Sequence, residues 1–203
     1  ITQILDTDNS AVKLVFRNST ETGNNMQIGA DGSNLVALTG ATERMRIDST
    51  GRLLIGTSSA RSSGGSVNAH LQLEGTTSQA AEFLIIRNTA DTFSPTLGLV
   101  KTRGTSVGSN TAVQDNDVIG KIQFRGADGS DIFSVGASIF ARVNGTPSDG
   151  TDMPAELVFA TSAEGSHSPT ERMFIDSTGR VGIGTASPEG ELDLGSSSSG
   201  RRL

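Results

Sequence analysis

One segment occurs twice in this chain, and this repetition constrains the fold more than any other feature of the sequence. Residues 42–60 (TERMRIDSTGRLLIGTSSA) and 170–188 (TERMFIDSTGRVGIGTASP) are identical at 14 of 19 positions. Self-similarity of this kind is the signature of a chain built from serial modules. The repeat therefore predicts a modular structural protein and not an enzyme.

Two further landmarks precede the repeated segment in both halves. Arg17-Asn18 follows an apolar stretch and returns as Arg87-Asn88, and the string GADGS at 29–33 returns at 126–130. The spacing between landmarks grows in the second half, which we interpret as two insertions into a second copy of the module. Such insertions usually map to loops or added hairpins, often on a face that meets a partner.

These landmarks predict four parts of the chain. We expect a first β module over 1–60, a Ser/Gly-rich linker over 61–70, a larger second β module over 71–188 and a C-terminal tail over 189–203. A further Ser/Gly-rich stretch over 195–200 is typical of a flexible connector. Because the chain starts with Ile1 and not with Met, we expect it to be a segment of a longer polypeptide.

The composition leaves little large apolar surface for two such modules. The chain has no Trp, no Tyr and only eight Phe, while Gly occupies 25 of its 203 positions. Small modules with few large side chains commonly need burial against a partner chain. We therefore expect an oligomer.

Charge and hydropathy exclude several classes of partner. The net charge is −6 and the basic residues are scattered, which argues against binding to nucleic acid or to an anionic membrane. No apolar run approaches the roughly 20 residues that span a bilayer. The absence of Cys excludes disulfides and thiolate metal sites but does not define a compartment.

Apolar residues alternate along the repeated segment, as expected for β-hairpins. We expect Met45, Ile47, Leu53 and Ile55 to point inward, with Arg46 and Leu54 on the exposed face. The equivalent inward residues of the second copy are Met173, Ile175, Val181 and Ile183. In the connecting DSTGR turns, the predicted structural positions are the Asx-type acceptors and the positive-φ glycines: Asp48, Gly51, Asp176 and Gly179.

The second module also carries long polar connections. Residues 136–143 and 156–161 predict a hairpin, and the connection over 144–154 is the best candidate for a projecting loop, followed by 163–169. Residues 76–86 are the only segment with some helical character, but their β-branched and aromatic end favours a strand. As candidate partner or receptor contacts we select the polar residues of the two loops: Asn144, Thr146, Ser148, Asp149, Asp152, Glu164, Ser166 and His167.

The pattern ERM-x-IDSTG-x-x-x-IGT resembles a motif that recurs in bacteriophage tail-fibre and related virion fibre proteins. Residues 107–131 and 152–173 resemble the module that precedes the distal part of such fibres. The resemblance covers most of 71–188 and, more loosely, 3–60.

This resemblance implies an intertwined homotrimer located in the virion, with a role in host attachment. Members often end in an endosialidase-type intramolecular chaperone that is cleaved off, and the ending GSSSSGRRL does not resemble one. In such a trimer, Gly56, Gly182 and Gly184 would allow strands to approach closely at a crowded axis.

The sequence offers little support for catalysis. The two histidines, His70 and His167, lie in Ser/Gly-rich connections away from any nucleophile motif. A pair of carboxylates for sugar hydrolysis is not excluded by sequence, but the aromatic rings that usually stack on sugars, Trp and Tyr, are missing. We therefore expect no catalytic residue and no enzyme activity.

Two acidic runs have alternate oxygen ligands, as calcium loops do. Residues 6–9 (DTDN) and 115–117 (DND) both lack the distant Glu of an EF-hand, so turn formation is the favoured role and no metal or cofactor is expected. The repeated pairs Glu43-Arg44 and Glu171-Arg172 are interpreted as ion pairs or interchain contacts.

The sequence thus predicts an all-β protein of tandem hairpin or sandwich-like modules in an elongated, intertwined trimer. The leading function is a phage tail fibre or spike segment, with itself and other virion proteins as partners and a host surface glycan or protein as a further one. A capsid-bound decoration fibre, a polysaccharide depolymerase and a bacterial adhesin remain as alternatives.

Overall fold

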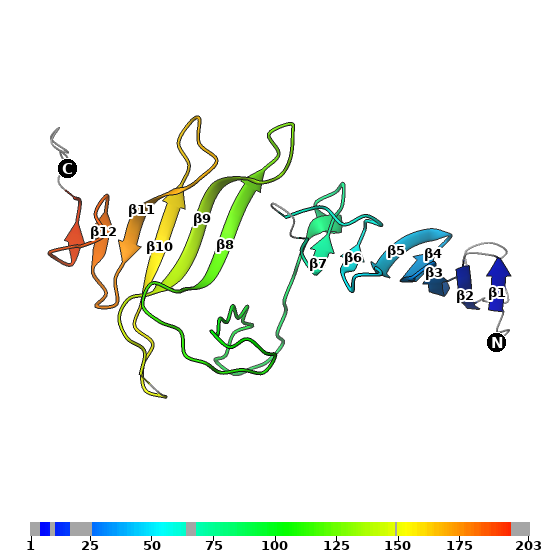
Figure 1. The fold of residues 1–203 in the computed structure, drawn as a ribbon, viewed down its shortest axis with the longest axis horizontal. Coiled ribbons are helices and arrows are strands. Elements are labelled where there is room, and N and C mark those ends of the chain that lie inside the picture. Colours follow the sequence, from blue (N-terminus) through cyan, green and yellow to red (C-terminus); the bar gives the residue numbers. More distant parts are fainter. Residues whose placement is uncertain (1–4, 9–10, 17–25, 64–67, 149, 196–203) are drawn as a thin grey trace. The chain divides into compact units, whose positions relative to one another are not determined.

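Alternating apolar and polar residues form two mainly antiparallel sheets, one in each of two units of the chain. The computed structural model describes residues 5–8, 11–16, 26–63, 68–148 and 150–195. The units comprise residues 1–95 and 96–203, and each is described by itself. Apart from one short 3₁₀ helix, all regular elements of the described residues are strands, which confirms the predicted all-β class (Figure 1).

The first sheet has seven strands, which follow one another in chain order from β1 to β7. Only the last pair, β6 with β7, is parallel. The strands are β1 (Leu5–Asp8), β2 (Ala11–Phe16), β3 (Met26–Asp31), β4 (Asn34–Thr39), β5 (Thr42–Ile47), β6 (Leu53–Ile55) and β7 (Leu71–Leu73).

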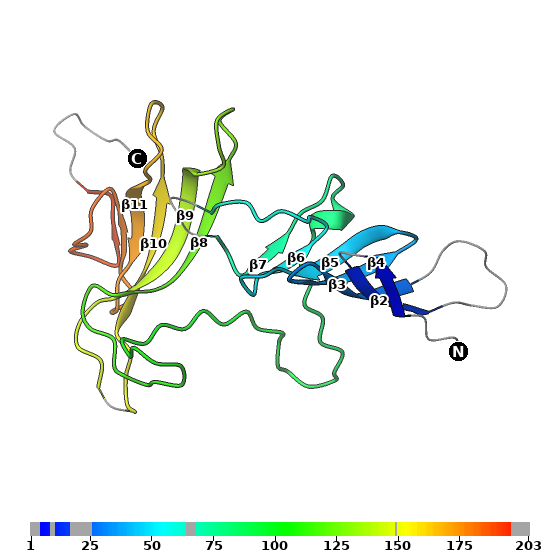
Figure 2. The same ribbon diagram turned by 45° about the vertical axis from the view of Figure 1, so that its right-hand side comes forward.

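The second sheet has six strands, again in chain order, with β8 at one edge and β13 at the other. Figures 1 and 2 show its middle strands side by side and strongly curved. The strands are β8 (Val118–Gly126), β9 (Ser134–Val143), β10 (Ala155–Thr161), β11 (Thr170–Ile175), β12 (Val181–Ile183) and β13 (Leu192–Asp193). The pairing of β9 with β10 confirms the hairpin predicted over 136–161.

The two sheets repeat the same strand pairing. Leu35 lies opposite Ile47 in the first sheet as Leu157 lies opposite Ile175 in the second, and the register shift before the strand end recurs at the same place. The final parallel pair also recurs, as β6 with β7 and β12 with β13. Strand by strand, β2–β7 therefore correspond to β8–β13.

This correspondence corrects three expectations from the sequence. GADGS connects β3 with β4 in the first sheet but lies between β8 and β9 in the second, so its two copies occupy different hairpins. Leu71–Leu73 was expected in the second module, yet it pairs with β6 and completes the first sheet. Leu192–Asp193, expected in the tail, is a strand of the second sheet.

The connection between the sheets is long and irregular. It contains the 3₁₀ helix η1 (Gln79–Ala81), after which residues 82–117 carry no strand. The strand favoured at the end of 76–86 is therefore wrong for this chain, although its side chains are apolar. Within the part of the chain that the structure describes, no helix has the length and apolar character to cross a membrane.

Candidate functional site

The two DSTGR turns have the same geometry in both sheets. Asp48 Oδ1 accepts hydrogen bonds from the backbone N–H groups of Thr50 at 2.9 Å and Arg52 at 3.1 Å. Asp176 does the same with Thr178 and Arg180, both at 2.9 Å. An aspartate that accepts from the chain two residues later fixes a tight turn locally, without help from tertiary contacts.

These hydrogen bonds favour the ionised carboxylate in both turns. The Thr178 hydroxyl is the largest influence on Asp176, and together with the backbone donors it lowers the pKa of this carboxyl to about 2. For Asp48, burial raises the pKa, but the bonds from Arg52 and Thr50 outweigh it and hold the pKa well below its ordinary value. Both turns therefore keep a charged aspartate at any pH above about 4.

Gly179 adopts the positive φ that this turn needs, at +87°, and its N–H donates to the Asp176 carbonyl at 3.0 Å. We expect Gly179→Val to destabilise the second unit by about 1 to 3 kcal/mol, because a β-branched residue is strained at positive φ. Urea unfolding measures this cost. Gly190→Val is the matched control, since Gly190 is surrounded by open space and has no positive φ, and it should cost less than about 0.5 kcal/mol. Equal stability of the two variants would contradict the turn assignment.

On one face of the second sheet, charged side chains cover a small apolar cluster. Its buried cluster consists of Phe140, Val158, Ala160 and Phe174. The Lys121 ammonium lies 4.7 Å from the centre of the Phe140 ring and the Arg142 guanidinium 5.7 Å from it. Long charged side chains can cover apolar surface with their stems while their heads stay in water. We call this surface the charged face.

A buried ion network anchors the charged face. Arg142 Nε donates to Glu156 Oε1 at 2.5 Å, and its two terminal nitrogens reach Glu171 at 3.0 and 3.2 Å. The Glu156 side chain is only 5 % exposed. The Arg142 pKa is raised because its hydrogen bonds to Glu156 and Glu171 outweigh the opposing effect of burial, which is the largest single influence. The repeated Glu171 is thus half of an ion pair, but with Arg142 and not with its sequence neighbour Arg172.

The opposite face of each sheet is apolar and is largely uncovered within its unit. Residues that lie directly opposite one another across neighbouring strands form continuous apolar rows, because side chains two residues apart share a face. In the second sheet one such row is Ile122, Ile139, Phe159, Met173 and Ile183. In the first sheet the row is Leu14, Ile28, Ala37, Met45, Ile55 and Leu73. We call these surfaces the apolar faces.

The exposure of the two faces is the reverse of what the sequence pattern suggested. Leu54, expected outside, is fully buried, and Phe174, on the equivalent face of the second sheet, is 5 % exposed. Ile47 and Ile183, expected inside, are 39 % and 38 % exposed. The apolar residues alternate as predicted, but within each unit no second layer of described residues covers the apolar face.

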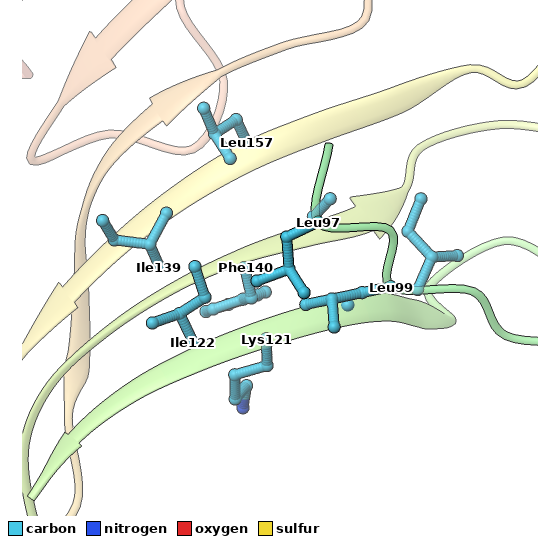
Figure 3. A pocket seen from close by; sticks show the side chains of 10 residues that line it. Leu97, Leu99, Lys121, Ile122, Ile139, Phe140 and Leu157 are labelled. Carbon is cyan, nitrogen blue, oxygen red and sulfur yellow. The ribbon is translucent and has the colours of Figure 1, made fainter. Parts of the chain in front are cut away.

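A short strap of the same unit crosses part of the second apolar face. Leu97 and Leu99 lie beside Ile122, Ile139 and Leu157, while Lys121 points away from them (Figure 3). The groove between strap and sheet encloses about 250 Å³ and is lined mainly by apolar atoms. Leu97 and Leu99 remain 63 % and 50 % exposed, so the strap covers this face only in part.

The loop over 144–154 replaces the tight turn that joins β3 with β4 in the first sheet. Its base is closed by the N–H of Asn144, which donates to the Pro154 carbonyl at 3.0 Å, and its tip by Ser148 N–H, which donates to Asp152 Oδ1 at 2.6 Å. Asn144 also accepts from Ser177 at 3.0 Å, which gives it a structural role. Thr146 is exposed, and Asp149 lies outside the described residues.

The second candidate loop, over 162–169, lies at the other end of the sheet. It replaces the tight turn between β4 and β5, and its Glu164, Ser166 and His167 are exposed. The His167 carbonyl accepts from Val135 N–H at 3.3 Å, which ties this loop to the end of the β8–β9 connection. The seven described contact residues are therefore split between opposite ends of the second sheet and do not form one surface.

The described residues show no arrangement typical of an active site. The His70 carbonyl accepts a backbone hydrogen bond from Leu53 at 2.8 Å, and His167 is described above. Asp115 and Asp117 accept hydrogen bonds from Gly145 N–H and from Arg103, respectively. Among the residues described, no group of three or more His, Cys, Asp or Glu side chains is placed to hold a metal ion. The side chains of residues 6–9 lie outside the description.

Known structures share this fold at low sequence identity. No protein-family model matches the sequence, and no curated protein is significantly similar to it. The carboxy-terminal domain of the bacteriophage T5 L-shaped tail fibre superimposes with a TM-score of 0.57 at 18 % identity, over 97 % of this chain and 79 % of that one. The same domain with its intra-molecular chaperone domain gives a TM-score of 0.46 at 14 % identity, over 91 % and 52 % of the two chains. The fold of this chain is thus similar to that of a phage tail-fibre domain.

Proposed function

We propose that this chain is a structural component of a phage tail fibre, without enzyme activity, that assembles as a homotrimer and contributes to host attachment. The observation that carries the proposal is the pair of apolar faces. Rows of apolar side chains run across neighbouring strands of both sheets, and their members Ile28, Ile122 and Ile183 are 40 %, 47 % and 38 % exposed in the single chain. Surfaces of this size and continuity mark sites of association.

Three copies provide a natural cover for these faces. Self-association through a closed rotation places the same face of each copy against its neighbours and leaves no apolar surface open for further growth. The charged faces then remain on the outside, in water. There Lys121 and Arg142 lie over the Phe140 ring. The fold likeness to a tail-fibre domain supports placing this assembly in the virion.

The native mass in solution tests the trimer. Sedimentation or light scattering should give a value near three times the chain mass of 20.9 kDa. A stable monomer at 20.9 kDa would contradict self-association. Microscopy of intact particles with a labelled chain then separates a tail fibre from a capsid-bound fibre, because the two differ only in where the assembly is attached.

Host contact is proposed for the loop over 144–154, which replaces a tight turn and projects from the sheet. Deleting Gly145–Asp152 should lower phage adsorption at least about tenfold, since losing one dominant contact residue commonly costs about 2 kcal/mol or more. The hydrogen bond between Asn144 and Pro154 closes the base of the loop, so the sheet should fold unchanged. Deletion of Glu164–Ser166, at the opposite end, is the control. Unchanged adsorption of the first variant would exclude this loop as a contact.

A further inference from the structure

The outer edge of β8 is open in the structure. β8 is the terminal strand of the second sheet, so no described strand pairs with it on its outer side. Lys121–Gly126 are all exposed, among them Ile122 at 47 % and Phe124 at 54 %. A long, apolar edge strand is a template for pairing with another strand, and folded proteins normally cover it.

In the first sheet, the edge that corresponds to the outer edge of β8 is paired with another strand. The pairing registers make β2 the counterpart of β8, because Leu14 lies opposite Ile28 as Ile122 lies opposite Ile139. The outer edge of β2 is not open, since β1 pairs antiparallel along it and places Leu5 opposite Leu14. The equivalent position beside Ile122 has no strand in the described residues.

The residues directly before β8 form a turn and not a strand paired with β8. Asp117 N–H donates to the Gln114 carbonyl at 3.0 Å, and Asn116 N–H donates to the Val143 carbonyl at 3.0 Å. The Asp117 carboxylate also binds Arg103 at 2.6 Å. This turn ties the chain to the end of β9, so residues 113–117 do not fold back along β8 as β1 folds back along β2.

An unpaired segment with strand character occurs earlier in the chain. Phe83, Leu84, Ile85 and Ile86 are 69 %, 66 %, 41 % and 67 % exposed and belong to no sheet. Aromatic and β-branched residues of this kind favour strands. The segment groups with the first unit, residues 1–95, and not with the unit that contains β8. Among the backbone hydrogen bonds of the described residues, none involves residues 83–86.

We propose that Glu82–Arg87 of one copy adds as an antiparallel strand to the β8 edge of a second copy. This inference rests on the self-association proposed above and specifies how the copies interlock. In the register that places Ile85 opposite Ile122, Phe83 lies opposite Phe124. This register continues the apolar face across the chain boundary.

Engineered disulfides test the exchange, because the native chain has no Cys. Residues directly opposite across antiparallel strands have Cα atoms about 4.5 to 5.5 Å apart, which lies within the range of a disulfide. We would combine Ile85→Cys with Lys121→Cys, Ile122→Cys or Gln123→Cys, so that a shift of one residue is still detected. After oxidation, a non-reducing denaturing gel should show covalent dimers and trimers for at least one pair.

A mixed sample separates exchange from pairing within one chain. Chains with only Ile85→Cys and differently tagged chains with only Ile122→Cys, produced together, should form a disulfide between the two tags, and each produced alone serves as the control. Disulfides confined to single chains, or none in any pair while the wild type is a trimer, would overturn the strand exchange alone. A monomeric wild type would overturn the exchange together with the proposed assembly.

Discussion

Replacing Ile122 with Glu should convert the assembly into folded monomers. Ile122 lies in the row of side chains that crosses the second apolar face, and it is 47 % exposed in the single chain. A carboxylate at this position reaches water in the monomer but would be enclosed among apolar side chains in the proposed assembly. Burying an unpaired charge costs about 3 to 5 kcal/mol, which weakens association roughly 100- to 4,000-fold.

The neighbouring residue on the same strand provides the control. Gln123 points to the charged face and its side-chain oxygen accepts a hydrogen bond from Arg125, which a carboxylate oxygen can also accept. Gln123→Glu should therefore keep the wild-type mass. Light scattering gives the mass, and thermal unfolding followed by circular dichroism shows whether each variant is folded. A wild-type mass for Ile122→Glu would show that the second apolar face is not an interface.

Replacing Arg142 with Met should destabilise the second unit by about 3 kcal/mol. The substitution removes the guanidinium that binds Glu156 and Glu171 and leaves the Glu156 carboxylate, which is 5 % exposed, without its cation. Asn144 Nδ2, at 3.4 Å, is the only other side-chain donor that the described structure places near it. Removing one partner of a buried ion pair costs about 3 to 5 kcal/mol, mainly because the remaining charge stays buried.

An exposed ion pair in the same chain shows the difference that burial makes. Arg87 binds Asp91 through side chains that are 38 % and 41 % exposed. Arg87→Met should cost less than about 1 kcal/mol, because water screens such pairs. Urea unfolding at neutral pH compares the two variants. Similar small losses would mean that Glu156 finds water or another donor when Arg142 is absent.

Both sheets have ion pairs on their charged faces, but the arginine of these ion pairs stands at different positions in the two sheets. In the first sheet Arg46 binds Glu43 at 2.7 Å and Asp31 at 3.2 Å. In the second sheet the position of Arg46 is taken by Phe174, and the position of Asp31 is taken by Arg142. The arginine has thus moved to another strand while the repeated glutamate, Glu43 or Glu171, kept its place. A cross-strand pair of this kind depends on register, which the linear repeat does not reveal.

The two sheets also differ in the residue that lies opposite position 46 or 174. Arg46 lies opposite Leu54 in the first sheet, whereas Phe174 lies opposite Gly182 in the second. A Cβ on Gly182 would clash with the Thr185 carbonyl, so the close approach that the sequence suggested for this glycine occurs within the chain. In each sheet this pair thus contains one buried apolar side chain, Leu54 in the first and Phe174 in the second.

The local structure of this protein was determined by the sequence alone. The alternation of apolar residues predicted the hairpins, and Asp176 with Gly179 predicted the turn between β11 and β12, because both features act over a few neighbouring residues. Predictions from the linear repeat were wrong where pairing between distant residues determines the structure. GADGS occupies different hairpins in the two sheets, and residues 84–86 form no strand in spite of their composition.

The tertiary structure decided which face of each sheet is covered. Leu54 and Phe174 are buried because long charged side chains such as Arg46 and Arg142 lie over their face, and these contacts join strands far apart in the chain. The apolar faces, which a sequence pattern assigns to the interior, stay exposed because one sheet has no second layer of its own. Alternation specifies two chemically different faces, but only the arrangement of strands in space determines what lies against each of them.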